Sequence, residues 1–193
     1  YSGYVAWDRT LKTLDMMTAD ELLSYAKTNN ITQLNDYYNV DNPANTNWQD
    51  EVLRTGFSHN HNVSINGGNE KTNYSASLNF QDREGVVRGT NMDRLNARTF
   101  VQTKALNNRL ELALSLNASI RNSSTGPTDI QGRSVLDAMY YYNPLVPVKN
   151  EDGTWYRNLN ISQNYNPLSM INEDRYDTKE KLLQGTAQAT LHI

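Results

Sequence analysis

Large apolar side chains alternate with small, uncharged polar ones in several runs of about ten residues. The run over 72–81 is the clearest. Successive side chains on a pleated strand lie on opposite faces, so this run predicts a strand with one apolar and one polar face. The apolar set is Tyr74, Ala76, Leu78 and Phe80, and the polar set is Asn73, Ser75, Ser77, Asn79 and Gln81. A second run over 110–121 repeats the pattern, with mostly Leu on its apolar side.

The polar residues of these runs are mainly Ser and Asn. A sheet face that is open to bulk water usually carries charged residues, which keep it soluble and protect its edges. Strands of about ten residues with an apolar outer face and a polar interior are typical of transmembrane β-barrels. The pattern therefore favours an all-β fold with short loop helices, in which the strands form a segment of an antiparallel transmembrane β-barrel.

The alternation predicts six strands over the whole sequence. Their expected ranges are 1–7, 57–66, 72–81, 94–105, 110–121 and 182–193. The connections between them alternate in length, with two long ones near 8–56 and 122–181. Outer-membrane barrels show this asymmetry, because their periplasmic turns are short and their extracellular loops are long. We therefore expect both long connections to be extracellular loops.

Local signals predict helices inside the long connections and a tight turn between two strands. Three short helices are expected, over 18–28, 47–53 and 134–142. Thr18 and Glu21 have the spacing of a capping box, which supports the first of them. Gly67 and Gly68 lie between two expected strands. Adjacent glycines can supply positive φ, so we expect them to form the tight hairpin turn.

Composition narrows the picture further. The chain has 193 residues, of which 37% are hydrophobic, and its mean hydropathy is -0.74. These values are too low for a helical membrane protein but not for a barrel wall, where only alternate residues face lipid. The net charge is -3 with scattered basic residues, which weighs against nucleic-acid binding. Cysteine is absent, so disulfides and thiolate sites are excluded. The sequence has no initiating Met or signal peptide and begins and ends inside expected strands, so we interpret it as a fragment.

Several stretches resemble the SusC/RagA family of TonB-dependent outer-membrane transporters. The most specific are 47–56 (NWQDEVLRTG) and 61–74 (HNVSINGGNEKTNY), and 1–5, 82–87 and 156–171 fit the same family in order. The resemblance covers essentially the whole chain, and its motifs mark the barrel rather than a catalytic site.

The resemblance implies a barrel of about 22 strands with an N-terminal plug domain. Such a protein imports glycans or peptides across the outer membrane, with a SusD-like surface lipoprotein as its lid and TonB as its energy coupler. Neither the plug nor a TonB box is present in this sequence. The chain is then expected to supply about six strands of the barrel, in contact with outer-membrane lipid, and to need the missing N-terminal part for TonB.

Two other classes of function were weighed. A soluble secreted β-sandwich that binds carbohydrate through loop aromatics is the main alternative, since its strands would bury the Leu-rich face against a second sheet. An enzyme is disfavoured, because the sequence has no Gly-x-Ser-x-Gly turn and no Gly-rich phosphate loop. No catalytic residue, metal or cofactor is therefore predicted.

Aromatic residues of the second long connection are the candidate ligand-binding residues. They are Tyr140, Tyr141, Tyr142, Trp155 and Tyr156. Their flat rings could stack on sugar rings, although packing of the loop onto itself is the favoured interpretation. His59 and His61 have a spacing that could share a metal ion, but no third ligand is evident. We interpret the two histidines as residues near a strand end at the membrane interface.

Overall fold

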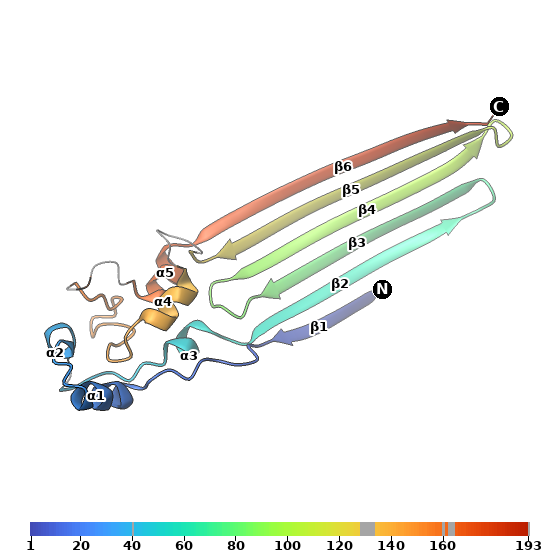
Figure 1. The fold of residues 1–193 in the computed structure, drawn as a ribbon. Coiled ribbons are helices and arrows are strands. Elements are labelled where there is room, and N and C mark those ends of the chain that lie inside the picture. Colours follow the sequence, from blue (N-terminus) through green and yellow to red (C-terminus); the bar gives the residue numbers. More distant parts are fainter. Residues whose placement is uncertain (40, 128–133, 160, 162–164, 193) are drawn as a thin grey trace.

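Six strands form one antiparallel sheet in the order β1-β2-β3-β4-β5-β6. The computed structural model of the chain describes residues 1–39, 41–127, 134–159, 161 and 165–192. The strands are β1 (Ser2–Asp8), β2 (Gly56–Gly68), β3 (Thr72–Glu84), β4 (Asn91–Ala105), β5 (Leu110–Thr125) and β6 (Tyr176–Leu191). Figure 1 shows the strands side by side, with the helices and long connections gathered at one end of the sheet. The expected count of six strands and the antiparallel arrangement are confirmed.

The register places like side chains in rows across the sheet. Leu78 of β3 lies opposite Val63 of β2 and Ala97 of β4, and Ala97 lies opposite Ala118 of β5. Directly opposed residues point to the same face, so this row is apolar from strand to strand. The neighbouring rows on the other face are formed by Ser, Asn, Gln and Arg. Every strand therefore presents the same apolar face, which is the two-faced pattern of the sequence.

The strands extend further toward the helical end than the alternation predicted. β6 begins at Tyr176 rather than near residue 182, and β5 continues to Thr125 rather than 121. Residues 176–181 are mostly charged or polar and show no apolar alternation, yet they pair with 120–125. Backbone hydrogen bonds need no particular side chain, so pairing continues beyond the apolar band. Ile193, the last residue of the expected sixth strand, lies outside the described residues.

The expected role of Gly67 and Gly68 is wrong. Both residues belong to β2, and neither has positive φ. The turn is built instead by Asn69, whose side-chain oxygen accepts from the backbone N–H groups of Lys71 and Thr72, both at 2.9 Å. An Asn side chain can close a turn in this way without left-handed residues. Gly67 lies opposite Tyr74, and a Cβ there would stand 2.6 Å from the Tyr74 hydroxyl, so this glycine makes room for a ring.

The helices form a separate unit at one end of the sheet, which we call the cap. They are α1 (Ala19–Thr28), α2 (Leu34–Tyr37), α3 (Trp48–Val52), α4 (Val135–Tyr141) and α5 (Pro167–Glu173). The three expected helices correspond to α1, α3 and α4, and the capping box of Thr18 and Glu21 is present. The sequence patterns do not predict α2 and α5. α2 has only four residues, and α5 begins at a proline whose preceding Asn166 caps it through two backbone N–H groups.

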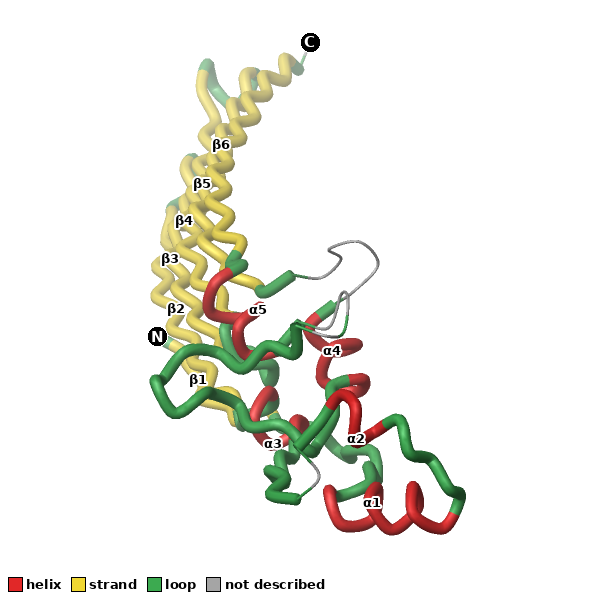
Figure 2. Tube along the Cα trace, turned by 90° about the vertical axis from the view of Figure 1, so that its left-hand side faces the viewer, coloured by secondary structure: helices red, strands yellow, loops and turns green. Residues whose placement is uncertain are grey.

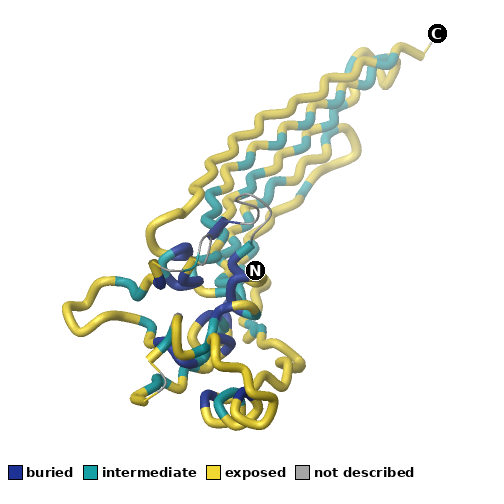
Figure 3. Tube along the Cα trace, turned by 60° about the vertical axis from the view of Figure 1, so that its left-hand side comes forward, coloured by how far each residue is buried: buried dark blue, intermediate teal, exposed yellow. Residues whose placement is uncertain are grey.

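Buried apolar side chains gather in the cap and not on the sheet. The core is Trp48, Val52, Val135, Ala138, Met139, Tyr142, Val146, Leu168, Met170 and Ile171. Figure 3 shows the buried positions concentrated at that end, while most of the sheet is exposed or intermediate. Figure 2 shows the strands as a single narrow layer. The described residues thus form a one-layer sheet and a packed cap, with no further domain and no second sheet.

Among the described residues, no helix has the length and apolar character needed to cross a membrane.

Candidate functional site

The apolar face of the sheet is exposed. Leu78, Leu114 and Leu116 are exposed by 49%, 47% and 45% of their surface, and Ile65 by 61%. A single soluble domain rarely leaves a contiguous apolar patch of this size uncovered. The apolar positions of β5 run from Leu110 to Ile120, which is ten steps of about 3.4 Å or about 34 Å along the strand. At the tilt of about 45° typical of barrel strands, this length gives a band about 24 Å high, close to the known height of about 25 Å.

A polar row ends this apolar band on the side of the cap. Asp82, Asp93, Asn122 and Lys179 lie opposite one another on β3, β4, β5 and β6 and share the face of the apolar residues. The side chain of Asn122 donates to a carboxylate oxygen of Asp93 at 2.7 Å. The band is therefore bounded by charged and amide groups at a fixed level across four strands.

An aromatic cluster lies on the same face at the edge formed by β1 and β2. Trp7 and Phe57 have ring centroids 5.5 Å apart, and the rings of His59 and His61 are 5.2 Å apart. The Tyr1 hydroxyl lies 2.7 Å from Nδ1 of His61. Within the part of the chain that the structure describes, no group of three or more metal-ligating side chains comes together. The two histidines are thus part of an aromatic row that runs along the strand.

The opposite face of the sheet is polar and contains a groove of about 590 Å³. Its lining comes from β2 to β6 and includes Ser64, Ser77, Arg98, Phe100, Asn117 and Gln184. Side-chain amides link the strands on this face, since Asn79 donates to Asn60 at 3.0 Å and Asn60 donates back at 3.3 Å. Hydroxyl and amide groups can both donate and accept hydrogen bonds. The face can therefore contact water or a polar ligand over its whole width.

The cap holds together segments that are far apart in the sequence. Its backbone bonds include Ala44 N–H to the carbonyl of Leu145 and Thr46 N–H to that of Pro144, both at 3.0 Å. The indole Nε1 of Trp48 donates to the carbonyl of Asn143 at 3.0 Å. These bonds join the connection between β1 and β2 to the connection between β5 and β6. The two long connections are consequently one folded unit.

The short β3–β4 connection is attached to the same unit. Arg54 N–H donates to the carbonyl of Val86 at 2.8 Å, and Arg88 N–H donates to that of Val52 at 2.9 Å. Gly89 has φ +77° and leaves room for Ile171, since a Cβ there would stand 2.5 Å from the Ile171 side chain. All three connections at this end of the sheet are therefore packed into the cap.

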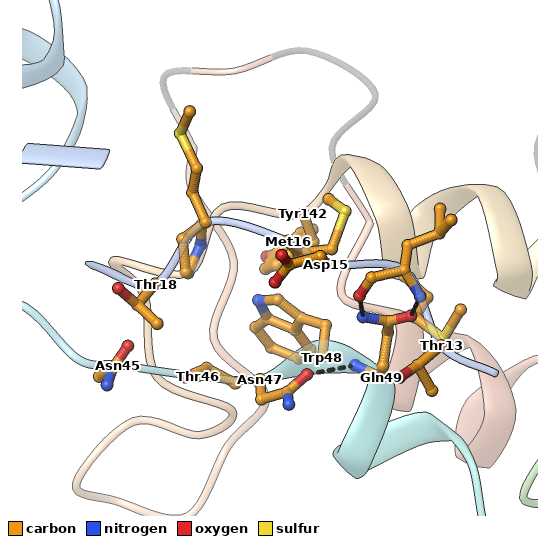
Figure 4. Close-up of a pocket in the computed structure, with 14 residues that line it drawn as sticks. Thr13, Asp15, Met16, Thr18, Asn45, Thr46, Asn47, Trp48, Gln49 and Tyr142 are labelled. Atoms are coloured by element: carbon orange, nitrogen blue, oxygen red, sulfur yellow. Dashed lines mark hydrogen bonds between the residues drawn. The ribbon is translucent and has the colours of Figure 1, made fainter. Parts of the chain in front are cut away.

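A pocket of about 490 Å³ opens between the two long connections (Figure 4). Trp48 and Gln49 of α3 lie among the residues that line it, together with Met139 and Tyr142 from the other connection. The buried Gln49 side chain is held by two bonds to Leu14, accepting from its N–H at 2.8 Å and donating to its carbonyl at 2.7 Å. The segment around Leu14 thus forms one wall of the pocket and is fixed to α3 by these two bonds.

The chemistry of this pocket is mixed. Its exposed wall carries Met16 and Met17, which are 45% and 50% exposed, beside Asp15 and Asn45. The side-chain oxygen of Asn45 accepts from the Ala19 N–H at 3.0 Å. Burial raises the pKa of the Tyr142 phenol above its usual range, so it stays protonated and donates to the Tyr156 carbonyl at 3.2 Å. The pocket can thus make apolar and hydrogen-bonding contacts, while its aromatic base is already engaged within the protein.

The chain is similar to known proteins in both sequence and structure. No protein-family model matches the chain. The TonB-dependent receptor SusC of Bacteroides thetaiotaomicron is 32% identical over 176 residues, which are 86% of this chain and 16% of that protein. The TonB-dependent receptor P3 of Formosa agariphila is 28% identical over 166 residues, 83% of this chain and again 16% of the relative. The chain belongs to the SusC/RagA family of TonB-dependent receptors.

Solved structures from the SusC/RagA family share the fold. The structure of the RagAB peptide transporter covers 97% of this chain with a TM-score of 0.67 and 18% identity, and the chain covers 26% of that structure. The RagAB peptide importer in the 'closed-closed' state gives a TM-score of 0.64. The sheet and cap thus resemble one part of the RagA barrel. The chain spans about one sixth of the length of the curated SusC-type relatives.

The five aromatic residues singled out in the sequence do not form one surface. Tyr142 is buried in the core, with its ring edge-on to Trp48 at a centroid distance of 4.8 Å. Tyr140, Trp155 and Tyr156 are partly buried and pack against the same core. Tyr141 is 85% exposed. Packing of the loop therefore accounts for four of the five, and Tyr141 alone among them presents most of its ring to solvent.

The residues that build the cap pocket carry little signal in the sequence. Gln49 and Trp48 sit in a stretch that was assigned only as a helix, and Met139 lies inside another expected helix. Trp48 and Asn143 are 95 positions apart. One signal was available, because Trp48 directly follows the capping Asn47, and a large apolar ring is uncommon at the start of an exposed loop helix. Their partners could not be inferred from local patterns.

Proposed function

We propose that this chain forms part of the wall of an outer-membrane, TonB-dependent importer of glycans or peptides. The observation that carries the proposal is the exposed apolar band, about 24 Å high, on a one-layer sheet, while the packed core of the described residues lies in the cap. Membership of the SusC/RagA family supports it, since its relatives are receptors and transporters rather than enzymes. A β-sandwich would need a second sheet over the Leu-rich face, and the described residues form one sheet.

The cap is proposed to lie on the cell exterior. All long connections are at its end of the sheet, and the turns at the other end, over 69–71 and 106–109, are short. This difference matches the known asymmetry of outer-membrane barrels. The polar face of the sheet then lines the interior of the barrel. The edges of β1 and β6 pair with strands outside this chain, because an unpaired strand edge is not tolerated in lipid.

A SusD-like surface lipoprotein and TonB are the proposed partners. The structural relatives are RagAB transporters, and the sequence relatives are named as TonB-dependent. The lipoprotein would contact the exposed surface of the cap, where Leu11, Met16 and Met17 are uncovered. TonB would act through a part of the protein outside this chain. Of the candidate aromatic residues, Tyr141 is the one proposed to contact a substrate, because its ring is exposed.

Epitope insertion in the full-length receptor tests both location and orientation. One tag is placed in the exposed turn at Gly153, where a side chain would meet nothing within 4 Å, and a matched tag at Asn107 in the β4–β5 turn. We expect antibody to reach the first tag in intact cells and the second only after the outer membrane is permeabilised. Recovery of the receptor as a soluble periplasmic protein, or the reverse labelling, would contradict the proposal.

A further inference from the structure

A groove of about 230 Å³ lies over β5 on the side of the sheet that is proposed to face lipid. Its apolar lining comes from three strands and consists of Leu95, Ala97, Ala118, Ile120, Leu182 and Leu183. Both sides of the groove belong to this chain, because β4 borders it on one side and β6 on the other. The interior of the barrel lies behind the sheet in the proposed arrangement. A segment that fills the interior therefore does not cover the groove.

The hollow results from two small residues that meet in the register. Ala97 of β4 lies directly opposite Ala118 of β5, while the next row toward the cap pairs Leu95 with Ile120. Leu183 of β6 lies opposite Ala118 on its other side. Methyl groups thus form the floor of the groove, and branched side chains form its walls. A hydrocarbon chain in this hollow gains dispersion contacts on several sides, which a flat sheet surface does not offer.

The groove lies at the end of the apolar band that is nearer the cap. The row of Leu95 and Ile120 is followed directly by the polar row that contains Asp93, Asn122 and Lys179. With the cap on the cell exterior, this is the level at which the acyl chains of the outer leaflet meet their headgroups. A lipid chain in the groove therefore has its headgroup beside the polar row.

Two lysines of β6 lie at the headgroup end of the groove. Lys181 lines the groove and lies opposite Ile120, and Lys179 lies one row further toward the cap on the same face. Glu180, between them in the sequence, points to the opposite face and binds Arg121 at 3.4 Å. A lysine at the edge of an apolar band extends its ammonium group toward the headgroups, where it attracts anionic lipid.

The carboxylates near this level are engaged or distant. Asp177 of β6 binds Arg175 at 2.9 Å. Asp93 accepts from the Asn122 amide at 2.7 Å and belongs to β4, which is two strands or about 9.6 Å from β6. The β6 side of the groove is therefore the positively charged side, which suits an anionic headgroup.

We propose that this groove binds one acyl chain of a phosphorylated lipid of the outer leaflet, with the phosphate held by Lys179 and Lys181. The site rests on the proposed function and adds a specific lipid site to it. The lipid is of the lipid A class, which carries acyl chains and phosphate on a disaccharide. A second copy of the receptor fits the groove less well, since a stable protein interface buries about 800 Å² on each partner and the groove spans two rows of side chains.

Native mass spectrometry of the full-length receptor, purified in detergent and stripped of lipid, tests the site. The probes are synthetic diphosphoryl lipid A and its dephosphorylated form, and we expect the phosphorylated lipid to bind more tightly. The double variant Lys179→Gln, Lys181→Gln should weaken binding of the phosphorylated lipid by about tenfold or more and leave the dephosphorylated lipid unaffected. Ala118→Trp should weaken binding of both lipids by about tenfold, because the indole fills the groove.

Matched controls separate the site from general effects of charge and size. Lys71→Gln removes a charge from the exposed turn at the other end of the sheet, and Val101→Trp places an indole on the same face outside the groove. Each should change the affinity by less than about twofold. Ala118→Leu is a smaller filling, and it takes the place of Ala118→Trp if that variant does not reach the membrane.

The possible results distinguish the parts of the proposal. Equal affinity for the two lipids, or an unchanged affinity in the lysine variant, would overturn the role of the phosphate. Unchanged affinity after filling at Ala118 would overturn the groove, as would a receptor dimer that the same filling dissociates. Loss of lipid binding together with the expected labelling of the two epitope tags counts against this site alone. A reversed labelling of the tags counts against the proposed function.

Discussion

Replacing Trp48 by Ala should open the cap while leaving the sheet intact. Trp48 is 4% exposed, donates to Asn143 at 3.0 Å and contacts the Tyr142 ring edge-on. It therefore joins the two long connections at one point. Truncation of a buried Trp to Ala costs about 3–5 kcal/mol, and this range already includes the lost edge-on contact of about 0.5–1.5 kcal/mol. The cost falls on the cap, because its core does not continue onto the sheet.

Amide hydrogen exchange of the full-length receptor measures this opening. The relevant amides are those of Ala44 and Thr46, which bond across the two connections. A loss of about 3–5 kcal/mol in the free energy of opening corresponds to exchange that is roughly 10²- to 4 × 10³-fold faster, up to the rate of an unstructured peptide. Amides of β4 and β5 should keep their protection, because their partners are backbone groups of the sheet.

The matched control is Tyr141→Ala, on the neighbouring helix α4. Tyr141 is 85% exposed, so its truncation should leave exchange in the cap within about twofold of the unmodified receptor. Two results would refute the reasoning. One is unchanged exchange at Ala44 and Thr46 in Trp48→Ala. The other is a simultaneous loss of protection over the whole sheet, which would mean that cap and sheet unfold together.

Three further perturbations have defined outcomes. Leu114→Arg should lower the free energy of unfolding of the receptor in lipid by about 2–4 kcal/mol, measured by urea unfolding. Ser115→Arg, on the polar face, should lower it far less. Equal losses in the two variants would count against lipid exposure of Leu114. Gly89→Ala should destabilise the cap by about 1–3 kcal/mol, since Gly89 has positive φ and faces Ile171, and unchanged thermal stability would contradict this. Hydrogen bonds from the backbone N–H and the hydroxyl of the capping residue Thr18 lower the pKa of Glu21 below its ordinary value of 4.5. Its contribution to α1 should therefore be complete above that value and be lost as pH falls through the lowered pKa. Glu21→Gln should remove this acid-dependent loss of protection in α1, measured as exchange relative to an unstructured peptide at the same pH.

The sheet could be predicted from the sequence because its signal is local. Alternation along 72–81 and 110–121 depends on neighbouring residues only, and it gave the number of strands and their two faces. The capping box of Thr18 and Glu21 is equally local and was present as expected. The start of β6 was missed because 176–181 has no apolar period and is held by backbone pairing with β5. The turn at Asn69 was misassigned because two glycines are a stronger sequence signal than an Asn side chain that accepts two backbone bonds.

The cap was beyond sequence reasoning for a different reason. Its core joins Trp48 and Val52 to residues of α4 and α5, and Trp48 bonds a carbonyl 95 positions away. Such contacts produce no periodic pattern in the sequence, since each segment alone resembles a polar loop with a short helix. Local sequence patterns thus predict the strands of the barrel wall, whereas the candidate sites depend on tertiary contacts between distant residues.

Lipid exposure of the apolar face is the central claim, and site-directed spin labelling tests it most directly. Residues 112 to 118 of β5 are replaced by cysteine one at a time in the full-length receptor, and each variant is spin-labelled in bilayers. This chain contains no cysteine of its own that would take up the label. We expect accessibility to oxygen, which partitions into lipid, to peak at Leu114 and Leu116. Accessibility to a water-soluble nickel complex should be higher at Ser115 and Asn117, which gives a period of two. Uniform accessibility along the strand, or oxygen maxima at the polar positions, would contradict the account.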